Sequence, residues 1–488
     1  MSNVRASTAW RERLITRAFL VCCLSICLPA ACKGSHGRGD AEKNKRLFEA
    51  IEARDIRRVK QAIREGADVN AEDDSGTSAL VAAAAAAAAR GNLEILELLL
   101  DNGANPNKHR EGTRAVLDEA ILWEREEIVL LLIERGAAVK EPSSGHTYLH
   151  GAAFYGFPRV ARELIRRGLD PQARGGFWDR TPLHEAARGG RSGCLAVLRV
   201  LLANGAKPSI NLPAKDGATA LHLATRDGHK DVRDELLAQG ASTGVPLLDA
   251  AARGDLVKVK KLLESDRKAV EMQDSYGWTA LHWAAVLHHR EMVQHLLERG
   301  ADPNVKDKRD LGPLYYVADE EEGGLVRLLV ERGTKVSPED ETTISSLHRA
   351  IWAGNMDNVK LLLSKGADPK SAGASGYPYL HTAAGSGRLK IARLLISRGV
   401  DVNALDRRER KTPLHLAVRS KRNAREMIAL LLANGADASI KDKYDRPPRD
   451  YVETHARGLL DLLPEDDAKP SEQRKTEKKP ESSTRTGG

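Results

Sequence analysis

The chain has 488 residues, of which 41% are hydrophobic and only 4% aromatic, so its interior must be built mainly from Leu, Ala, Val and Ile. A length of this size predicts several globular domains unless the sequence contains a repeat. The formal net charge of +8 is mild for this length, and no basic stripe with interleaved aromatic residues is visible, which argues against a nucleic-acid-binding protein.

The first 31 residues differ in character from those that follow. Four arginines precede an apolar run of 14 residues, from Ala18 to Ala31, and they are Arg5, Arg11, Arg13 and Arg17. This arrangement resembles a secretory signal, and the apolar run is short for a transmembrane helix, which needs about 20 residues. The small residues before Cys32 also resemble a bacterial lipoprotein signal, in which Cys32 would be lipidated, although Pro29 stands where that family usually has Leu. Lipid anchoring, simple secretion and a merely apolar N-terminus all stay open.

The cysteine distribution favours export with anchoring. Four of the five cysteines lie in the N-terminal segment, which leaves Cys194 alone in the body and allows no structural disulfide there. Residues 32–43 are rich in Gly, Ser and charge and are predicted to form a flexible tether. The several acyl chains of a lipoprotein would suffice for stable membrane anchoring. The predicted location is therefore the bacterial cell envelope, lipid-anchored, or else the periplasm or the exterior.

A leucine recurs at intervals of 33 or 34 residues, at Leu247, Leu281, Leu314, Leu347, Leu380 and Leu414. Around such leucines the sequence reads Thr181-Pro182-Leu183-His184, Thr279-Ala280-Leu281-His282 and Thr412-Pro413-Leu414-His415. A glycine then ends the second half of most units, as in Gly66, Gly300 and Gly435. The period and the Thr-Pro-Leu-His signature resemble the ankyrin repeat.

Each part of the signature has a physical role. Thr can cap a helix and Pro is tolerated at its first position, Leu and Ala form an apolar stripe, and Gly ends the second helix in a left-handed conformation. Two short helices bury too little apolar surface to offset the entropy of ordering about 33 residues, so the units must stack on one another. The predicted fold is an all-α ankyrin-repeat solenoid of about thirteen units between Asn44 and Leu463.

One irregularity divides the array. Leu221 and Leu247 are separated by only 26 residues, and the unit at Leu247 lacks the usual Thr and His, as the opening unit also does. We therefore predict two repeat blocks, 44–242 and 243–463, joined around residues 242–246 either as a continuous bend or as a flexible hinge. Residues 464–488 carry balanced charges and almost no apolar side chains, so they are predicted to be disordered.

The histidines do not suggest catalysis or metal binding. They recur at one position of the repeat, at His150, His184, His222, His282, His348, His381 and His415. The ankyrin resemblance implies that this side chain makes hydrogen bonds linking adjacent turns. No zinc-helix spacing, phosphate-binding loop or nucleophile elbow is present. We predict no catalytic residue, no metal site, no cofactor and no enzymatic activity.

The ankyrin resemblance implies that partners contact the turn tips and the exposed side of the first helix. Those positions hold the candidate binding residues Phe154, Tyr155, Phe177, Trp178, Tyr276, Trp278, Lys308, Arg309, Arg408 and Lys411. Exposed aromatic side chains are common interface anchors, but the same rings could instead cover irregular gaps between repeats. The predicted function is a non-enzymatic protein–protein interaction scaffold exported to the cell envelope. The alternative is a stoichiometric regulator or inhibitor subunit of a partner enzyme.

Overall fold

The computed structural model describes residues 38–108, 115–139, 146–320, 324–336, 345–372, 376–452 and 454–463. The predicted signal segment, Cys32 and residues 464–488 lie outside these ranges. Within them the backbone is helical or in loops, and extended pairing is limited to isolated bridges between Glu72 and Ser78 and between Gly175 and Arg180. The predicted all-α class is confirmed.

The chain divides into two compact units, the first ending at Arg309 and the second beginning at Asp310. The sequence placed a block boundary at residues 242 and 243, which lie inside the first unit, and that division stays a prediction. The first helix begins at Arg38, so residues 38–43, which the sequence assigned to a tether, are helical.

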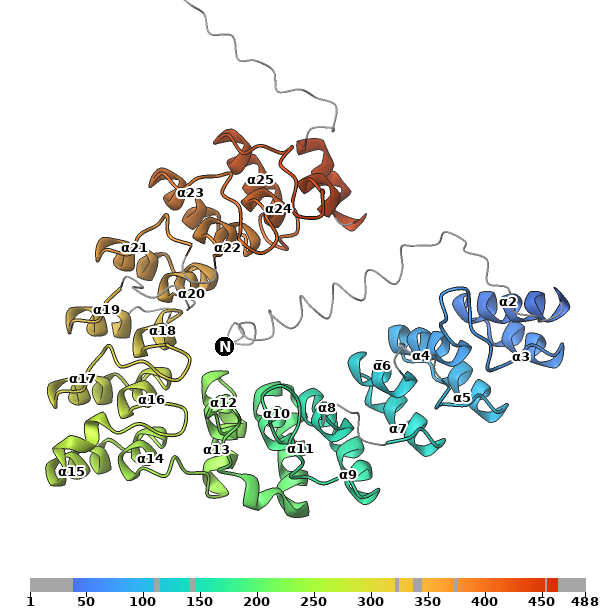
Figure 1. Cartoon of the computed structure of the whole chain (residues 1–488), viewed down its shortest axis with the longest axis horizontal. Coiled ribbons are helices and arrows are strands. Elements are labelled where there is room, and N and C mark those ends of the chain that lie inside the picture. The colour runs from blue at the N-terminus through green and yellow to red at the C-terminus, as the bar shows by residue number, and fades with distance from the viewer. Residues whose placement is uncertain are drawn as a thin grey trace, which may run out of the picture. The chain divides into compact units, whose positions relative to one another are not determined.

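The first unit consists of paired helices: α2 (Arg38–Glu52), α3 (Ile56–Arg64), α4 (Ala79–Arg90), α5 (Glu94–Asp101), α6 (Val116–Leu122), α7 (Glu126–Glu134), α8 (Tyr148–Tyr155), α9 (Pro158–Arg166), α10 (Pro182–Gly189), α11 (Cys194–Leu201), α12 (Ala220–Arg226), α13 (Lys230–Ala238), α14 (Pro246–Ala252), α15 (Leu256–Ser265), α16 (Ala280–Val286) and α17 (Arg290–Glu298). Short turns η2 (Leu202–Ala206), η3 (Lys207–Ser209) and η4 (Arg267–Glu271) follow α11 and α15. Figure 1 shows the first helix of each pair, such as α8, α10 and α12, in one layer and the second, such as α9, α11 and α13, in another.

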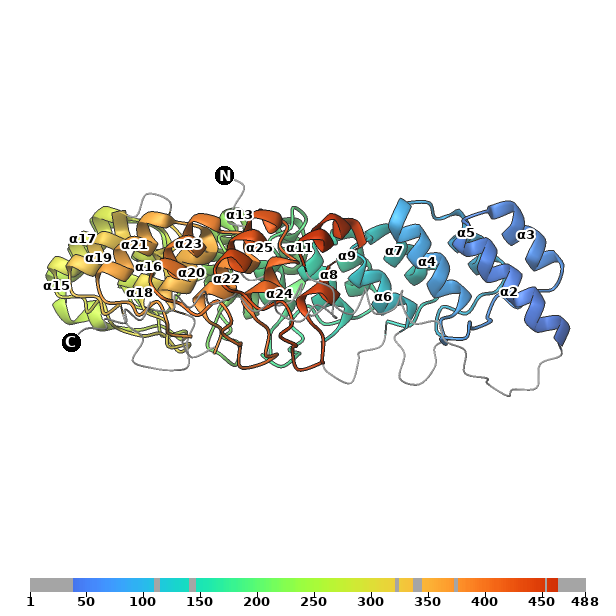
Figure 2. The ribbon, with the colours of Figure 1, turned by 90° about the horizontal axis from the view of Figure 1, so that it is seen from above.

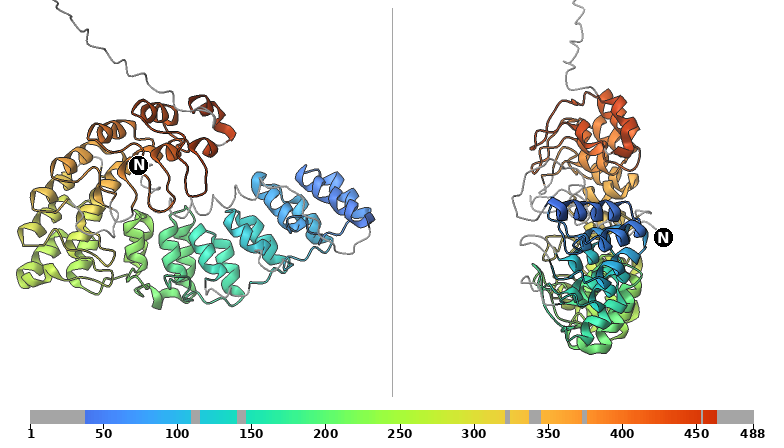
Figure 3. Two further views of the ribbon diagram at one scale, coloured as in Figure 1. Left: turned by 45° about the horizontal axis from the view of Figure 1, so that its top comes forward. Right: turned by 90° about the vertical axis from the view of Figure 1, so that its right-hand side faces the viewer.

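The second unit repeats this plan with α18 (Pro313–Val317), α19 (Gly324–Glu331), α20 (Ser346–Ala353), α21 (Met356–Ser364), α22 (Tyr379–Gly385), α23 (Leu389–Ser397), α24 (Pro413–Ala417) and α25 (Ala424–Ala433). It ends with the 3-10 helices η5 (Pro448–Tyr451) and η6 (Thr454–Leu462). In each unit the loops that connect successive pairs project from one side of the helix layers (Figure 2). The left-hand view of Figure 3 shows such loops after α23 and α25.

The core is made by the residues that define the repeat. In α10, Leu183, Ala186 and Ala187 are fully buried, and the small alanines let neighbouring first helices approach closely. At the end of α17, Gly300 adopts a φ of +94°, a left-handed conformation that a residue with a Cβ adopts only at a cost. Helix α10 therefore starts and packs, and helix α17 ends, where the sequence signature predicts.

The histidine that recurs in the repeats joins one repeat to the next. In α10, Nδ1 of His184 accepts a hydrogen bond from the backbone N–H of Thr181 at 3.2 Å, so its other ring nitrogen, Nε2, is free to donate to the carbonyl of Ala218 in the following loop, at 3.1 Å. His150, His348, His381 and His415 likewise place Nε2 against a carbonyl of the following loop. Burial lowers the pKa of His184 to about 4, so the ring is neutral at pH 7. These contacts match the linking role that the resemblance implied.

Candidate functional site

Four loop tips of the first unit lie next to one another and are called the tip row here: residues 175–180, 214–218, 274–278 and 307–309. Hydrogen bonds join them in order. The N–H of Lys215 donates to the carbonyl of Trp178 at 2.8 Å, and the N–H of Lys308 donates to the carbonyl of Tyr276 at 3.1 Å. Between these, the hydroxyl of Ser275 donates to the carbonyl of Gly217 at 2.9 Å. The tip row is therefore one continuous strip of surface.

Residues 274–278 reach residues 214–218 because the intervening repeat, α14–α15, has no tip. The connection from α13 to α14 is short, and the Asp249 carboxylate ties it down by accepting hydrogen bonds from Ser242 Oγ at 2.7 Å and the Thr243 N–H at 2.6 Å. The missing tip accounts for the 26-residue interval in the sequence. It leaves a gap beside α12 that the next tip fills.

A buried aromatic cluster fills this gap. The rings of His222, Tyr276, Trp278 and Trp283 contact one another with centroids 4.9 to 5.5 Å apart. Tyr276 and Trp278 are both 0% exposed. The prediction that these two residues lie on an exposed binding surface is wrong. They cover a gap between repeats, which is the other interpretation that the sequence left open.

Asp274 is the polar centre of the cluster. Its Oδ2 accepts a hydrogen bond from the Trp283 indole N–H at 2.8 Å and lies 2.9 Å from Nε2 of His222. Its Oδ1 accepts the backbone N–H groups of Tyr276 and Trp278 at 3.0 Å each. Burial by itself raises the pKa of Asp274, but His222 and these hydrogen bonds outweigh it and hold the pKa below its usual value. His222 thus faces a carboxylate where the other linking histidines described above face a carbonyl.

Phe177 and Trp178 are the exposed aromatic residues of the tip row, with 78% and 43% of their surface accessible. Their rings meet edge to face with centroids 5.0 Å apart. Nζ of Lys215 lies 5.5 Å from the centre of the Phe177 ring, and the guanidinium of Arg180 lies 5.8 Å from that of Trp178. The structure therefore places both rings on an accessible surface.

Phe154 and Tyr155 lie at the end of α8 and are half-buried, outside the tip row. The guanidinium of Arg191 lies over both rings, 5.1 Å from the centre of Phe154 and 4.6 Å from that of Tyr155. Arg191 is itself paired with Glu124 at 2.6 Å. These two rings are partly covered by the protein's own side chains and offer less surface than Phe177.

The four basic candidates differ in exposure. Lys308 and Arg309 of the tip row and Arg408 of the second unit are exposed. Lys411 is only 7% exposed. Its Nζ donates a hydrogen bond to Glu409 at 2.5 Å, and its backbone N–H donates one to the Asp406 carboxylate in the same loop. Its predicted surface position is wrong.

Tyr444 of the second unit is a further exposed aromatic residue, which was not among the predicted binding residues, with 56% of its surface accessible. The Nζ of Lys443 lies 4.8 Å from its centroid and the Arg446 guanidinium 4.9 Å from it. Tyr444 follows Asp442 by two residues, as Tyr276 follows Asp274, so its place at a loop tip could have been recognised from the repeat.

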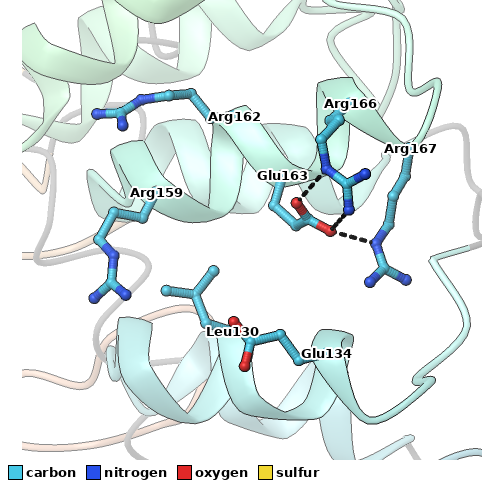
Figure 4. A pocket seen from close by; sticks show the side chains of 7 residues that line it. All are labelled: Leu130, Glu134, Arg159, Arg162, Glu163, Arg166 and Arg167. Atoms are coloured by element: carbon cyan, nitrogen blue, oxygen red, sulfur yellow. Dashed lines mark hydrogen bonds and ion pairs between the residues drawn. The ribbon is translucent and has the colours of Figure 1, made fainter.

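An arginine-lined cleft of about 540 Å³ lies between α7 and α9, and none of the predicted binding residues lines it (Figure 4). On one side the Glu163 carboxylate accepts hydrogen bonds from Arg166 at 2.7 and 2.8 Å and from Arg167 at 2.7 Å. These bonds lower the pKa of Glu163 to about 2. Arg159 and Arg162 line the other side, and Glu134 adds a second carboxylate. The two carboxylates offset half of the positive charge.

Among the described residues, no three His, Cys, Asp or Glu side chains are grouped so that they could hold a metal ion. The same ranges contain no helix with both the length and the apolar character needed to cross a bilayer. Cys194 is buried at the start of α11, and burial raises the pKa of its thiol, which makes the thiol less reactive at neutral pH.

Stacked helix pairs with projecting loops define a solenoid protein of the repeat class. The family profile described as ankyrin repeats (3 copies) matches residues 47–143, 85–175, 149–246, 242–307 and 347–442. The chain belongs to the ankyrin repeat family. Ankyrin repeats are protein-interaction modules, so a surface that binds another protein is the kind of site to expect.

Several curated proteins are similar over part of the chain. A palmitoyltransferase, AKR1, from Lachancea kluyveri is 32% identical over 165 residues, which cover 32% of this chain and 22% of that protein. Human ankyrin repeat and SOCS box protein 16 is 33% identical over 209 residues, 39% of this chain and 44% of the relative. Mouse NF-kappa-B inhibitor delta is 30% identical over 181 residues, 36% of this chain and 52% of the relative. The chain thus spans about half or less of each of these relatives.

Two solved structures are also similar. The human ASB11 ankyrin repeat domain is 25% identical, covers 45% of this chain and 96% of its own, and has a TM-score of 0.40. The ankyrin repeat domain of Bcl-3 is 24% identical, covers 45% of this chain and 99% of its own, and has a TM-score of 0.37.

Proposed function

We propose that this protein is a non-enzymatic scaffold of the cell envelope that binds another protein through the tip row. The observation that carries the proposal is the exposure of Phe177 and Trp178 in a chain with few aromatic residues. Rigid aromatic rings are frequent anchors of protein interfaces, because they bury a large area at a small entropic cost. The family supports protein binding in general, and the tip row supplies a particular surface.

The test is partner capture by crosslinking in the native compartment, with wild type compared with the Phe177→Ser/Trp178→Ser variant. We expect the variant to lose capture while its melting temperature changes little, since both side chains face solvent. Tyr444→Ser is the matched control, because it removes another exposed ring from the second unit. A large drop in the melting temperature of the double variant would mean that the two rings are structural, and unchanged capture would place the binding surface elsewhere.

The export part of the proposal rests on the N-terminal sequence alone. Four arginines, a short apolar run and small residues before Cys32 support an exported and lipidated N-terminus. Metabolic labelling with a fatty-acid probe should mark the wild-type protein and leave Cys32→Ser unmarked. Fractionation that finds the full-length protein in the cytoplasm would contradict export itself.

The alternative role is a stoichiometric regulator or inhibitor of a partner enzyme. It is supported by the similarity to mouse NF-kappa-B inhibitor delta, whose name describes an inhibitor. Co-purification with one enzyme in a fixed ratio, together with a change in that enzyme's activity, would favour this role. Several weakly bound partners would favour the general scaffold.

A further inference from the structure

Most carboxylates beside the first two tips are already paired with arginines. Asp179 accepts from Arg174 at 2.8 Å, and Asp216 lies 3.6 Å from Arg180. Glu185, at the base of these tips on α10, lies 3.8 Å from Arg180. Glu185 also lies 3.3 Å from Arg188, so three arginines balance the three carboxylates and this group adds little net charge to the surface.

Two lysines of the tip row are left without such a partner. Lys215 and Lys308 are exposed, and neither Nζ forms an ion pair with the described residues. Nζ of Lys215 lies over the Phe177 ring, while a Cβ placed on Gly217 would lie 3.1 Å from Nζ of Lys308. The exposed groups therefore follow one another as Phe177, Lys215 and Lys308, with aromatic surface at one end and positive charge along the remainder.

The aromatic end can hold both apolar and polar groups. Phe177 is 78% exposed and Trp178 is 43% exposed. The indole N–H of Trp178 makes no hydrogen bond to the residues that the structure describes. A partner side chain could thus bury apolar area on Phe177 while a nearby acceptor takes this N–H.

We propose that the tip row binds an extended acidic segment of a protein partner. An apolar side chain of the segment docks on Phe177 and Trp178, and carboxylates further along it pair with Lys215 and Lys308. An extended segment fits because the tips are joined side by side in a line, and acidic character fits because the two uncompensated charges are positive. A nucleic acid fits less well, since two unpaired cations would neutralise few phosphates. This inference rests on the proposed protein-binding function.

The experiment selects peptides from a random decapeptide phage library on the purified full chain, since ten extended residues span roughly 33 Å. We expect enriched sequences to combine several Asp or Glu residues with one bulky apolar residue. Binding of an enriched peptide, measured by fluorescence anisotropy, should weaken about tenfold in Lys215→Glu/Lys308→Glu and about thirtyfold in Trp178→Ser. Lys60→Glu/Lys258→Glu is the matched control, with the same change in charge on exposed parts of α3 and α15.

The outcomes separate this inference from the function on which it rests. Peptides that depend on Phe177 and Trp178 but show no acidic preference would keep the protein-binding surface and overturn the acidic partner. Absence of enrichment, or enrichment insensitive to the aromatic variants, would overturn both. A fluorescent single-stranded dT20 oligonucleotide is titrated in parallel. If it binds as tightly as the selected peptides and is lost on charge reversal, the row is a nucleic-acid site and the inference fails.

Discussion

Replacement of Trp278 by Ala tests whether the tip 274–278 holds two non-adjacent repeats together. Trp278 is 0% exposed, its ring contacts His222 and Trp283, and its indole N–H donates to Asp307 at 3.2 Å. Burial of about 200 Å² of ring at about 25 cal/mol/Å² contributes about 5 kcal/mol, and measured costs of removing a buried Trp are about 3–5 kcal/mol. We therefore expect Trp278→Ala to destabilise this region by about 3–5 kcal/mol.

Hydrogen exchange with mass spectrometry is the suitable assay, because a long repeat protein need not unfold in one step. Protection against exchange should fall in residues 274–283. It should also fall in residues 214–226, which belong to the repeat before α14–α15 and not to the neighbouring one. Trp178→Ala is the matched control, since it removes the same side chain from an exposed position, and it should change protection by less than about 1 kcal/mol. Equal effects of the two substitutions, or unchanged exchange in 214–226, would refute the reasoning.

Three further predictions follow from local geometry. Gly217 has a φ of +83°, and a Cβ at this position would lie 1.9 Å from the Ser275 carbonyl oxygen. Gly217→Ala should therefore lower the free energy of unfolding by about 1–3 kcal/mol more than Gly300→Ala, because Gly300 also has a positive φ but open space around it. Denaturant unfolding measures both losses, and equal losses would contradict a close contact between the tips. The buried histidines His150, His184, His348 and His381 have a pKa of about 4, so between pH 4 and pH 6.5 they bind protons only when the chain unfolds. The stability that they contribute should therefore be complete above pH 6.5 and should fall as the pH drops toward 4, by on the order of 3 kcal/mol for each histidine. A melting temperature that is unchanged between pH 7 and pH 5 would argue against neutral buried rings at these positions. Glu163→Gln should lower the free energy of unfolding by less than about 1 kcal/mol, although the pKa of Glu163 is low, because solvent screens its ion pair with Arg166. A larger loss, measured by thermal unfolding, would show that the ion pairs of the cleft between α7 and α9 stabilise the fold.

The sequence by itself determined the repeat and its local structure. The residues of the repeat signature act within one repeat or between adjacent repeats, so their roles follow from their spacing. Examples are Leu183 with its neighbouring alanines, the Thr181–His184 pair and Gly300. The same spacing located the loop tips and hence the exposed residues Phe177 and Trp178.

Only the tertiary structure decided which tip residues are exposed. The sequence shows the short interval before Leu247. It does not show that residues 274–278 fill the space beside α12 and that Tyr276 and Trp278 are buried there. Lys411 and Tyr444 occupy comparable loops, yet the first is buried against Glu409 and the second stands in solvent. Exposure at a tip depends on contacts within the loop, as between Lys411 and Glu409, and on contacts with distant loops, as between the Ser275 hydroxyl and the Gly217 carbonyl. A pattern with a 33-residue period does not specify those contacts.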